Sequence, residues 1–334
     1  MSYERIISRC FKNLKPEDAA GFFTFDNQAA TMLNVKPGFN IVNSLVTMVE
    51  GVHFLSSIKA EHLAYKAVAS SYSKLMALGA SPLCLHCNIS IPEVNIAWLE
   101  SFSSGLEIAI KQYGGSLVGA SVVTGKTSIA ISAIGEVNQD LLTGAKDKVE
   151  EGDLIYVTGS LGDSGLALKR ILQNIPNDDT TTKYLESCLM RPNLPLEFAV
   201  AAKKHFVLGV ELMSGFLQDF ERIIQIENIG AHIELDKIPL SNEIVAIIER
   251  NAAYQCAFTG SDDCQLCFIV KPHNVADVKS LANQFNTKIS CVGKLVADPG
   301  FKVFDVHGDE FVVKRPDHDH FAILDDCEND NAAR

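Results

Sequence analysis

The segment GASVVTGKT, residues 119–127, differs by one residue in spacing from a phosphate-binding loop. Such a loop has four residues between its first Gly and the Gly-Lys-Ser/Thr triplet, because consecutive backbone N–H groups wrap the phosphates and the Lys reaches them. Here five residues separate Gly119 from Gly125, and Ala120 stands where the first Gly is required. A strand-like stretch, 128–137, follows instead of a helix. We therefore do not expect a phosphate loop.

Two cysteine pairs have the CxxC spacing of zinc and redox sites, Cys84 with Cys87 and Cys264 with Cys267. Both lie in strand-like stretches, where residues three apart point to opposite faces. Neither pair has the Gly or Pro at which a zinc knuckle bends. We expect structural cysteines. The nine cysteines are irregularly spaced, which favours reduced thiols over a disulfide framework.

The segment LIYVTGSLGDSGLALKRIL, residues 154–172, has the pattern of a strand, a glycine-rich turn and a helix. Backbone N–H groups at the start of such a helix can receive a phosphate. In the alternative interpretation, Gly159, Gly162, Asp163 and Ser164 only shape the turn and cap the helix. The segment alone does not decide between the two.

Hydrophobic periodicity predicts the elements that position these segments. In the first half we expect helices near 6–14, 61–78 and 98–113, with strands near 40–54, 83–91, 116–123 and 127–137. In the second half we expect strands near 232–235 and 266–270, with helices near 194–205, 217–227 and 275–285. The alternation indicates a mixed α/β class. The polar stretch 144–153 predicts a domain boundary, which divides the chain into 1–143 and 144–334.

Composition narrows the classes of partner. A formal net charge of -12 and a pI near 5.2 argue against binding to a nucleic-acid backbone. No apolar run reaches the ~18 residues of a membrane span, and the first residues lack the apolar core of a signal peptide. We expect a cytoplasmic protein that meets small molecules or other proteins and contacts neither nucleic acid nor membrane.

Five segments together resemble the thiamine-monophosphate kinase family, in the superfamily of aminoimidazole ribonucleotide synthetase. They are MVEGVHFL (48–55), HLAYKAVASSYSKLMALGASP (62–82), WLESFSSGL (98–106), GDLIYVTGSLGDSGLAL (152–168) and DHDHF (317–321). The resemblance implies a two-domain fold whose N-terminal ATP-binding domain forms an intersubunit barrel in a homodimer. It also implies ATP and Mg2+ as cofactors, and transfer of the γ-phosphoryl group to thiamine monophosphate.

Members of this family carry a ring of aspartates around several Mg2+ ions, and this sequence departs from that ring. The family's Gly-Asp-Asp-Ala-Ala motif is matched at Asp26, its Thr-Asp at Leu45-Val46, and its Ser-Asp-Leu at Ser73-Lys74-Leu75. The family's Gly-Gly-Asp-Thr-Thr loop falls on Gly119 to Val123, so that the opening segment matches a former metal loop. The remaining carboxylates at matched positions, all candidate metal ligands, are Asp26, Glu211, Asp219, Asp262 and Asp263.

The resemblance also assigns ligand contacts. Candidate substrate-binding residues are His53, Asp262 and His318, and candidate nucleotide-binding residues are Lys74, Ala120, Ser121 and Ser214. In the alternative interpretations, His53 is a rim residue, Lys74 a solvated helix residue and His318 part of a solvated tail. If Lys74 faces the site, it replaces a metal ion or grips a phosphate.

Three functions follow from these assignments. The first is a working kinase with a rebuilt metal site. The second is a non-catalytic pseudoenzyme dimer that acts as a ligand-binding regulator or scaffold. The third is a different chemistry on another anionic substrate, in which Lys74 stands in for an ion. Because Lys74 puts a positive charge where a dication is expected, impaired catalysis is the interpretation we favour.

Overall fold

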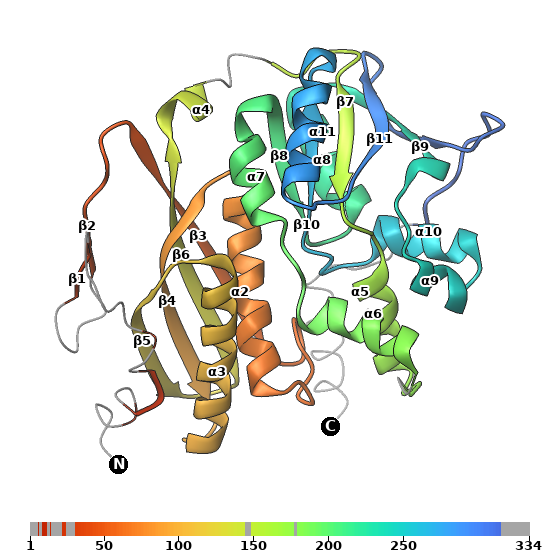
Figure 1. The fold of residues 1–334 in the computed structure, drawn as a ribbon. Helices are drawn as coiled ribbons and strands as arrows, with labels where there is room; N and C mark the ends of the chain where they lie inside the picture. The colour runs from red at the N-terminus through yellow and green to blue at the C-terminus, as the bar shows by residue number, and fades with distance from the viewer. Residues whose placement is uncertain are drawn as a thin grey trace, which may run out of the picture.

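The computed structural model describes residues 31–143, 148–176 and 179–314, together with 6, 9–11, 14 and 22–24. The N-terminal half is built on a four-stranded sheet with the order β3-β6-β4-β5 (Figure 1). Its strands are β3 (Phe39–Val49), β4 (Ser81–Ile91), β5 (Leu117–Thr124) and β6 (Ser128–Asn138). Strand β6 is antiparallel to β3 and β4, whereas β4 and β5 are parallel. A separate ribbon pairs β1 (Phe22–Thr24) with β2 (Thr31–Leu33).

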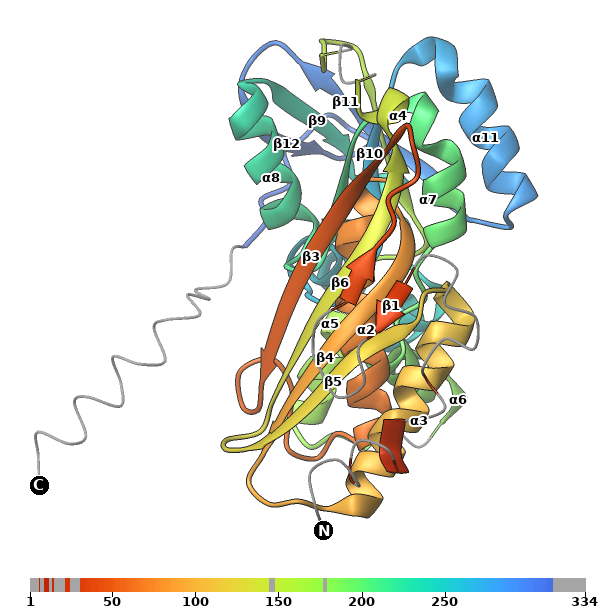
Figure 2. The ribbon, with the colours of Figure 1, turned by 90° about the vertical axis from the view of Figure 1, so that its left-hand side faces the viewer.

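Two long helices, α2 (Ala60–Ala77) and α3 (Ile96–Tyr113), pack together beside this sheet, and a short helix, α4 (Gln139–Thr143), follows β6. Figure 2 shows the sheet turned toward the viewer with α2 behind its strands. Gly105 lies where α3 meets α2, and a Cβ added there would lie 2.1 Å from the carbonyl oxygen of Glu61. The close approach of the two helices therefore requires glycine at this position.

The C-terminal half is a six-stranded sheet with the order β12-β9-β11-β7-β10-β8. Its strands are β7 (Leu154–Thr158), β8 (Phe206–Leu212), β9 (Gly230–Glu234), β10 (Gln265–Val270), β11 (Ile289–Val296) and β12 (Gly300–Phe304). Its helices are α5 (Asp163–Leu172), α6 (Thr180–Met190), α7 (Leu196–Ala202), α8 (Phe216–Glu227), α9 (Asn242–Ile247), α10 (Arg250–Thr259) and α11 (Val275–Gln284). All strand pairs are antiparallel except β9 with β12.

One hydrophobic core joins the two halves through α2. Leu63 and Val68 of α2 belong to the same cluster as Ile131 of the first sheet and as Phe206 and Phe268 of the second. A second cluster, which includes residues of α8, covers the other face of the C-terminal sheet. Because α2 lies between the two sheets, almost all of its residues are buried. Polar residues on this helix must therefore find partners inside the protein.

The mixed α/β class is confirmed, and so are the helices expected near 61–78 and 98–113. The strand expected over 40–54 ends earlier, at Val49, because Gly51 has a φ of 81° and its N–H donates to the carbonyl of Phe54 at 2.8 Å. Strand β8, helices α6, α9 and α10, and strands β11 and β12 were not predicted. The helix expected over 6–14 falls mostly outside the described residues. The boundary between 143 and 144 adjoins undescribed residues and stays a prediction.

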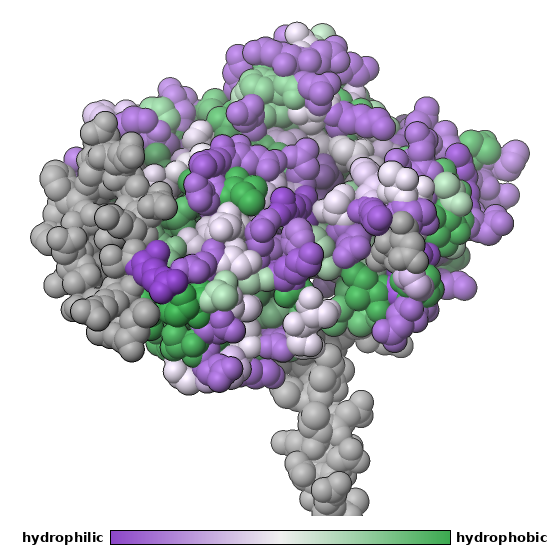
Figure 3. Space-filling view, turned by 60° about the horizontal axis from the view of Figure 1, so that its bottom comes forward, coloured by the Kyte–Doolittle hydropathy of each residue, from purple (hydrophilic) through white to green (hydrophobic). Residues whose placement is uncertain are grey.

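No helix among the described residues is long and apolar enough to cross a bilayer. On the face shown in Figure 3, the apolar areas are separate from one another and lie among hydrophilic side chains. Figure 3 therefore shows no continuous apolar surface on that face.

Candidate functional site

The site begins with three polar residues on α2, Lys66, Ser70 and Lys74, which recur every four positions and so share one face of the helix. Both lysines form ion pairs with carboxylates of the C-terminal half, Glu211 and Asp262. We call these five residues the interdomain seam. The seam lies where the family resemblance places part of a metal site. Whether the carboxylates of Glu211 and Asp262 are free or paired therefore decides whether they can bind a metal ion.

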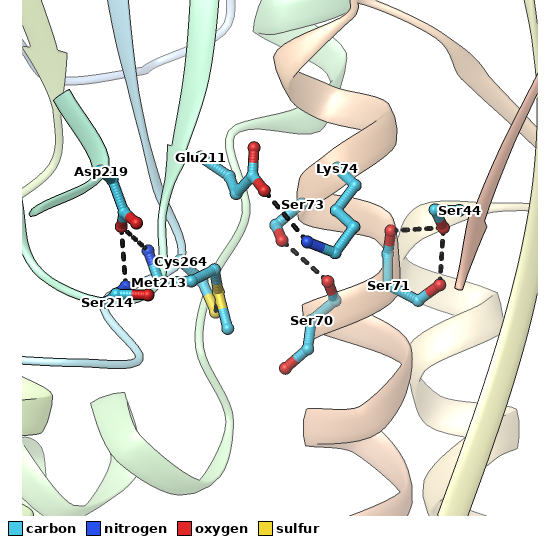
Figure 4. A network of polar contacts seen from close by, with 10 residues as sticks. All are labelled: Ser44, Ser70, Ser71, Ser73, Lys74, Glu211, Met213, Ser214, Asp219 and Cys264. Carbon is cyan, nitrogen blue, oxygen red and sulfur yellow. Dashed lines mark hydrogen bonds and ion pairs between the residues drawn. The ribbon is translucent and has the colours of Figure 1, made fainter. Parts of the chain in front are cut away.

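Lys74 and Glu211 face each other across the seam (Figure 4). The Lys74 ammonium donates to a Glu211 carboxylate oxygen at 3.1 Å, and the side chains are 42% and 24% exposed. The sequence assigned Glu211 to a metal and Lys74 to a nucleotide. The structure brings the two together and neutralises each with the other.

Lys66 and Asp262 form the second pair of the seam. The Lys66 ammonium lies 3.0 Å from the Asp262 carboxylate, and the side chains are only 4% and 19% exposed. Asp262 has a φ of 69°, a left-handed conformation that is uncommon for a residue with a side chain. Its backbone N–H donates to the carbonyl of Met213 at 2.8 Å, which ties this loop to the end of β8. Sequence reasoning missed Lys66, although its spacing of eight residues from Lys74 was a usable signal.

Ser70 lies on α2 between the two lysines and is 3% exposed. Among the described residues, its Oγ is the one buried side-chain oxygen or nitrogen without a hydrogen-bond partner. By contrast, the buried Oγ of Ser71 lies 2.8 Å from the Oγ of Ser44 on β3 (Figure 4). A buried hydroxyl without a partner costs about 1–3 kcal/mol. Ser70 is therefore destabilising in the middle of the seam.

Asp219 lies in the first turn of α8 and accepts hydrogen bonds from the backbone N–H groups of Met213 and Ser214, both at 2.7 Å. Burial raises the pKa of Asp219, and the two N–H groups oppose that shift. The carboxylate therefore holds the turn between β8 and α8. Ser214, assigned to nucleotide binding from the sequence, contributes its backbone N–H to this turn.

Asp263 has a different environment from its neighbour Asp262. It accepts from the backbone N–H of Gly162 at 2.8 Å and from the hydroxyl of Ser164. Burial raises its pKa to about 7, against the opposing effect of these two donors. A carboxylate of the chain itself thus occupies the start of α5, where a phosphate was one of the two alternatives. The structure supports the other, in which the glycine-rich turn and its neighbours have a structural role.

The other predicted site residues lie elsewhere. His53 lies in the turn after β3, where its Nδ1 accepts from the backbone N–H of Val49 at 3.1 Å. Ala120 and Ser121 lie on β5, the edge strand opposite β3, where the Ser121 hydroxyl donates to Asn88 at 2.9 Å. Because α2 packs on this sheet mainly against β3 and β6, with fewer contacts to β4, the structure does not bring Ala120 and Ser121 to the seam. Asp26 and His318 lie outside the described residues.

The carboxylates present do not fit the several Mg2+ ions that the resemblance implies. Mg2+ requires near-octahedral oxygen ligands, chiefly carboxylates and water. Glu211 and Asp262 are paired with lysines, Asp219 accepts two backbone N–H groups, and Asp263 is buried at the start of α5. Within 31–143, 148–176 and 179–314, no three His, Cys, Asp or Glu side chains gather as a metal-binding group. We derive no chemical step through a metal here.

Cys84, Cys87 and Cys267 lie on strands as predicted, whereas Cys264 lies just before β10 with a φ of 54°. Cys84 and Cys87 are both buried on β4, and Cys264 and Cys267 belong to two different core clusters on opposite faces of the C-terminal sheet. Burial raises the pKa of Cys84 to about 11, which keeps this thiol protonated and unreactive near neutral pH. The segment 119–127 consists of the end of β5 and a bend, and β6 begins directly after it at Ser128, as expected for a segment that is not a phosphate loop.

Two family profiles together match most of the chain. Residues 26–137 match the family profile of the AIR synthase related protein, N-terminal domain, and residues 150–306 match that of the C-terminal domain. The thiamine-monophosphate kinase of Haemophilus influenzae is 33% identical over 264 residues, which cover 79% of this chain and 80% of that protein. The thiamine-monophosphate kinase of Escherichia coli K12 is 31% identical over 293 residues, with coverage of 87% and 90%.

Solved structures agree with this placement. The crystal structure of thiamine-monophosphate kinase from Stenotrophomonas maltophilia matches with a TM-score of 0.80 and 26% identity, over 90% of this chain and 94% of that chain. A structure described as AaThiL complexed with AMPPCP and TMP matches with a TM-score of 0.73 and 22% identity, over 84% and 88%. At that identity the second likeness concerns the fold alone.

Proposed function

The chain belongs to the thiamine-monophosphate kinase family of AIR synthase related proteins, and we propose that it keeps the family fold while metal-dependent phosphoryl transfer is impaired. The family activity is ATP-dependent phosphorylation of thiamine monophosphate to thiamine diphosphate. Phosphoryl transfer depends on metal ions that bridge the phosphates and neutralise the developing charge. The proposal therefore rests on whether the carboxylates that would hold those ions are already paired with other groups.

The observation that carries the proposal is the Lys74–Glu211 pair. At an effective dielectric constant of ~20, a unit positive charge about 4 Å from a dication costs on the order of 8 kcal/mol before relaxation. Lys74 is 42% exposed, so its side chain can swing outward and the real penalty is smaller. Val46 and Ser214, at positions where the family has aspartates, supply no carboxylate to offset the rest.

An activity assay tests the proposal. The purified chain is incubated with ATP, Mg2+ and thiamine monophosphate, with the Escherichia coli enzyme as positive control, and thiamine diphosphate is measured by chromatography. We expect this chain to form thiamine diphosphate far more slowly than the control, or not at all. Mg2+-dependent product formation at a rate close to that of the control would refute the proposal and favour a kinase with a rebuilt metal site, using Asp26, Glu211, Asp219, Asp262 or Asp263.

The alternative to a slow enzyme is a non-catalytic pseudoenzyme that acts as a ligand-binding regulator or scaffold. Both share the degraded metal site, and calorimetry with a nucleotide analogue separates them from a working kinase. We expect any binding to be weak and unchanged by Mg2+, because the Mg2+ bridge between protein and phosphates has too few ligands. Tight binding that requires Mg2+ contradicts both versions.

We also propose that the chain is a homodimer joined through the open face of its N-terminal sheet. Ile41 and Leu45 of β3 alternate toward that face and are 37% and 65% exposed, although both are large and apolar. A second copy of the sheet would cover them. Sedimentation velocity is expected to give a dimer, and Leu45→Glu, which puts a charge into the interface, is expected to give a monomer. A wild-type monomer at micromolar concentration contradicts the dimer.

A further inference from the structure

A cavity of about 600 Å3 lies between the C-terminal end of α3 and the C-terminal half of the chain. Its volume falls in the range of small-molecule sites. None of the five seam residues lines it. Of the described positions that the family resemblance assigns to metal, nucleotide or substrate, Asp263 alone lines the cavity.

Three helices end at this cavity. Its walls include Tyr113 at the end of α3, Arg191 just after α6 and Phe285 just after α11. The C-terminal end of a helix carries roughly half a negative charge, because the last carbonyl groups have no partners within the helix. Helices α5 and α7 begin at the same cavity, and their positive N-terminal ends oppose this contribution, so the charged side chains decide the sign of the potential.

Two buried carboxyl groups line the cavity together with the exposed Glu197. Asp163 and Asp263 line the cavity and are 2% and 9% exposed. The hydrogen-bond donors to Asp163 are neutral hydroxyls, those of Ser160 at 2.7 Å and Ser241 at 2.6 Å. Burial raises the pKa of Asp163, as expected for a carboxylate whose hydrogen-bond donors carry no charge. Neither carboxylate has a cationic partner within salt-bridge distance in the described part of the chain.

The two cations at the cavity do not cancel this charge. The Arg191 guanidinium forms an ion pair with Glu61 and donates to His62 Nδ1 at 3.0 Å, so its charge is already engaged. Lys288 lies at the rim, is exposed, and acts on Asp163 only as a more distant charge. Because the pKa of Asp263 is about 7, this carboxyl is only partly ionised near neutral pH, and the excess of negative charge at the cavity comes from Asp163 and the exposed Glu197.

Aromatic rings complete the lining. Tyr184 is 39% exposed, and Tyr113 and Phe285 are partly exposed, so their rings are accessible to a bound molecule. Aromatic faces attract cations, and the attraction increases where water is excluded. The amides of Gln112 and Gln265 are the polar groups that would orient a ligand.

We propose that this cavity binds a small organic cation, held between the carboxylates of Asp163 and Glu197 and the accessible aromatic rings. The carboxylates and the rings favour the same ligand chemistry, a positive charge on a flat or compact apolar body. The proposal is independent of phosphoryl transfer, because the ligand needs neither phosphate nor metal.

The test uses a matched pair of probes. Benzamidine is a flat aromatic cation, and benzamide is its neutral counterpart of nearly the same shape. Binding of each to the full chain is followed by ligand-observed NMR in low salt. We expect benzamidine to bind at least about tenfold more tightly than benzamide, with the difference shrinking as ionic strength rises. Equal binding of the two probes, or no binding of either, overturns the proposal.

Variants at the rim separate a specific site from a general effect of net charge. Tyr184→Ala removes an accessible ring and is expected to weaken benzamidine binding about threefold. Lys288→Glu removes the rim cation and is expected to tighten binding about threefold or more. Lys126→Glu makes the same change of charge on an exposed bend of the N-terminal half and is expected to have no effect. If Lys288→Glu and Lys126→Glu behave alike, the cavity is not the binding site.

Discussion

The two lysine pairs of the seam are predicted to contribute very differently to stability, although both join α2 to the C-terminal half. Lys66→Met removes the ammonium group of a side chain that is only 4% exposed. It leaves Asp262, whose side chain is 19% exposed, without its cationic partner. Breaking a buried pair costs about 3–5 kcal/mol, and the residual exposure of Asp262 places the expected loss near about 3 kcal/mol. Lys74→Met breaks a pair exposed to 42% and 24%, for which about 0–1 kcal/mol is expected.

Urea unfolding followed by circular dichroism measures both losses, and the fluorescence of Trp98, the one tryptophan of the chain, gives a second probe. The double variant Lys66→Met/Asp262→Asn removes both charges and is expected to recover about 2 kcal/mol of the loss, since no buried charge is left without a partner. The reasoning about burial is refuted if Lys66→Met and Lys74→Met destabilise equally. It is also refuted if the double variant is as unstable as the sum of its two single variants.

Other perturbations test single contacts. Ser70→Ala is expected to leave the free energy of unfolding unchanged or to raise it, because it removes a hydroxyl without a partner, whereas Ser71→Ala is expected to lower it by about 1 kcal/mol; urea titrations that rank the two in the opposite order contradict this. Gly105→Ala is expected to lower the thermal midpoint by several degrees, because a Cβ would overlap the Glu61 carbonyl oxygen; an unchanged midpoint by calorimetry excludes the close approach. The Asp263 carboxyl has a pKa of about 7 in the folded state against 3.8 ordinarily, so the folded state holds the extra proton and its stability falls as pH rises from about 4 to about 7. Asp263→Asn is expected to flatten that part of the pH profile, and parallel profiles for the two proteins would show that Asp263 ionises normally.

Periodicity in the sequence was sufficient for the long amphipathic elements and insufficient for the short, buried ones. Helix α3 shows a clear apolar stripe, and its predicted and observed ends agree within two residues. Strand β8 was missed because VLGVEL has no alternation of apolar and polar residues, since both of its faces pack against protein. Helix α10, RNAAYQCAFT, carries too few large apolar residues to mark a stripe.

For the candidate site, too, only part could be predicted from the sequence. Motif matching located Glu211, Asp219 and Asp262 and recognised that Lys74 reverses an expected charge. It did not find that Lys66 neutralises Asp262, because the two are 196 residues apart in the chain and meet only after folding. Nor did it separate Asp262 from Asp263, because the left-handed backbone at Asp262 is what sends adjacent carboxylates to different environments.

Because α2 lies between the two sheets, the two halves of the chain are not expected to unfold independently. A helix that supplies core residues to both halves cannot be removed from one without exposing the other. The part of the chain that follows residue 148, expressed alone, would expose the surface around Phe206 and Phe268 and would leave two carboxylates, Glu211 and Asp262, without their lysines. The two halves are therefore expected to melt together in one cooperative transition, and a fragment of either is expected to aggregate unless its missing half is supplied in trans.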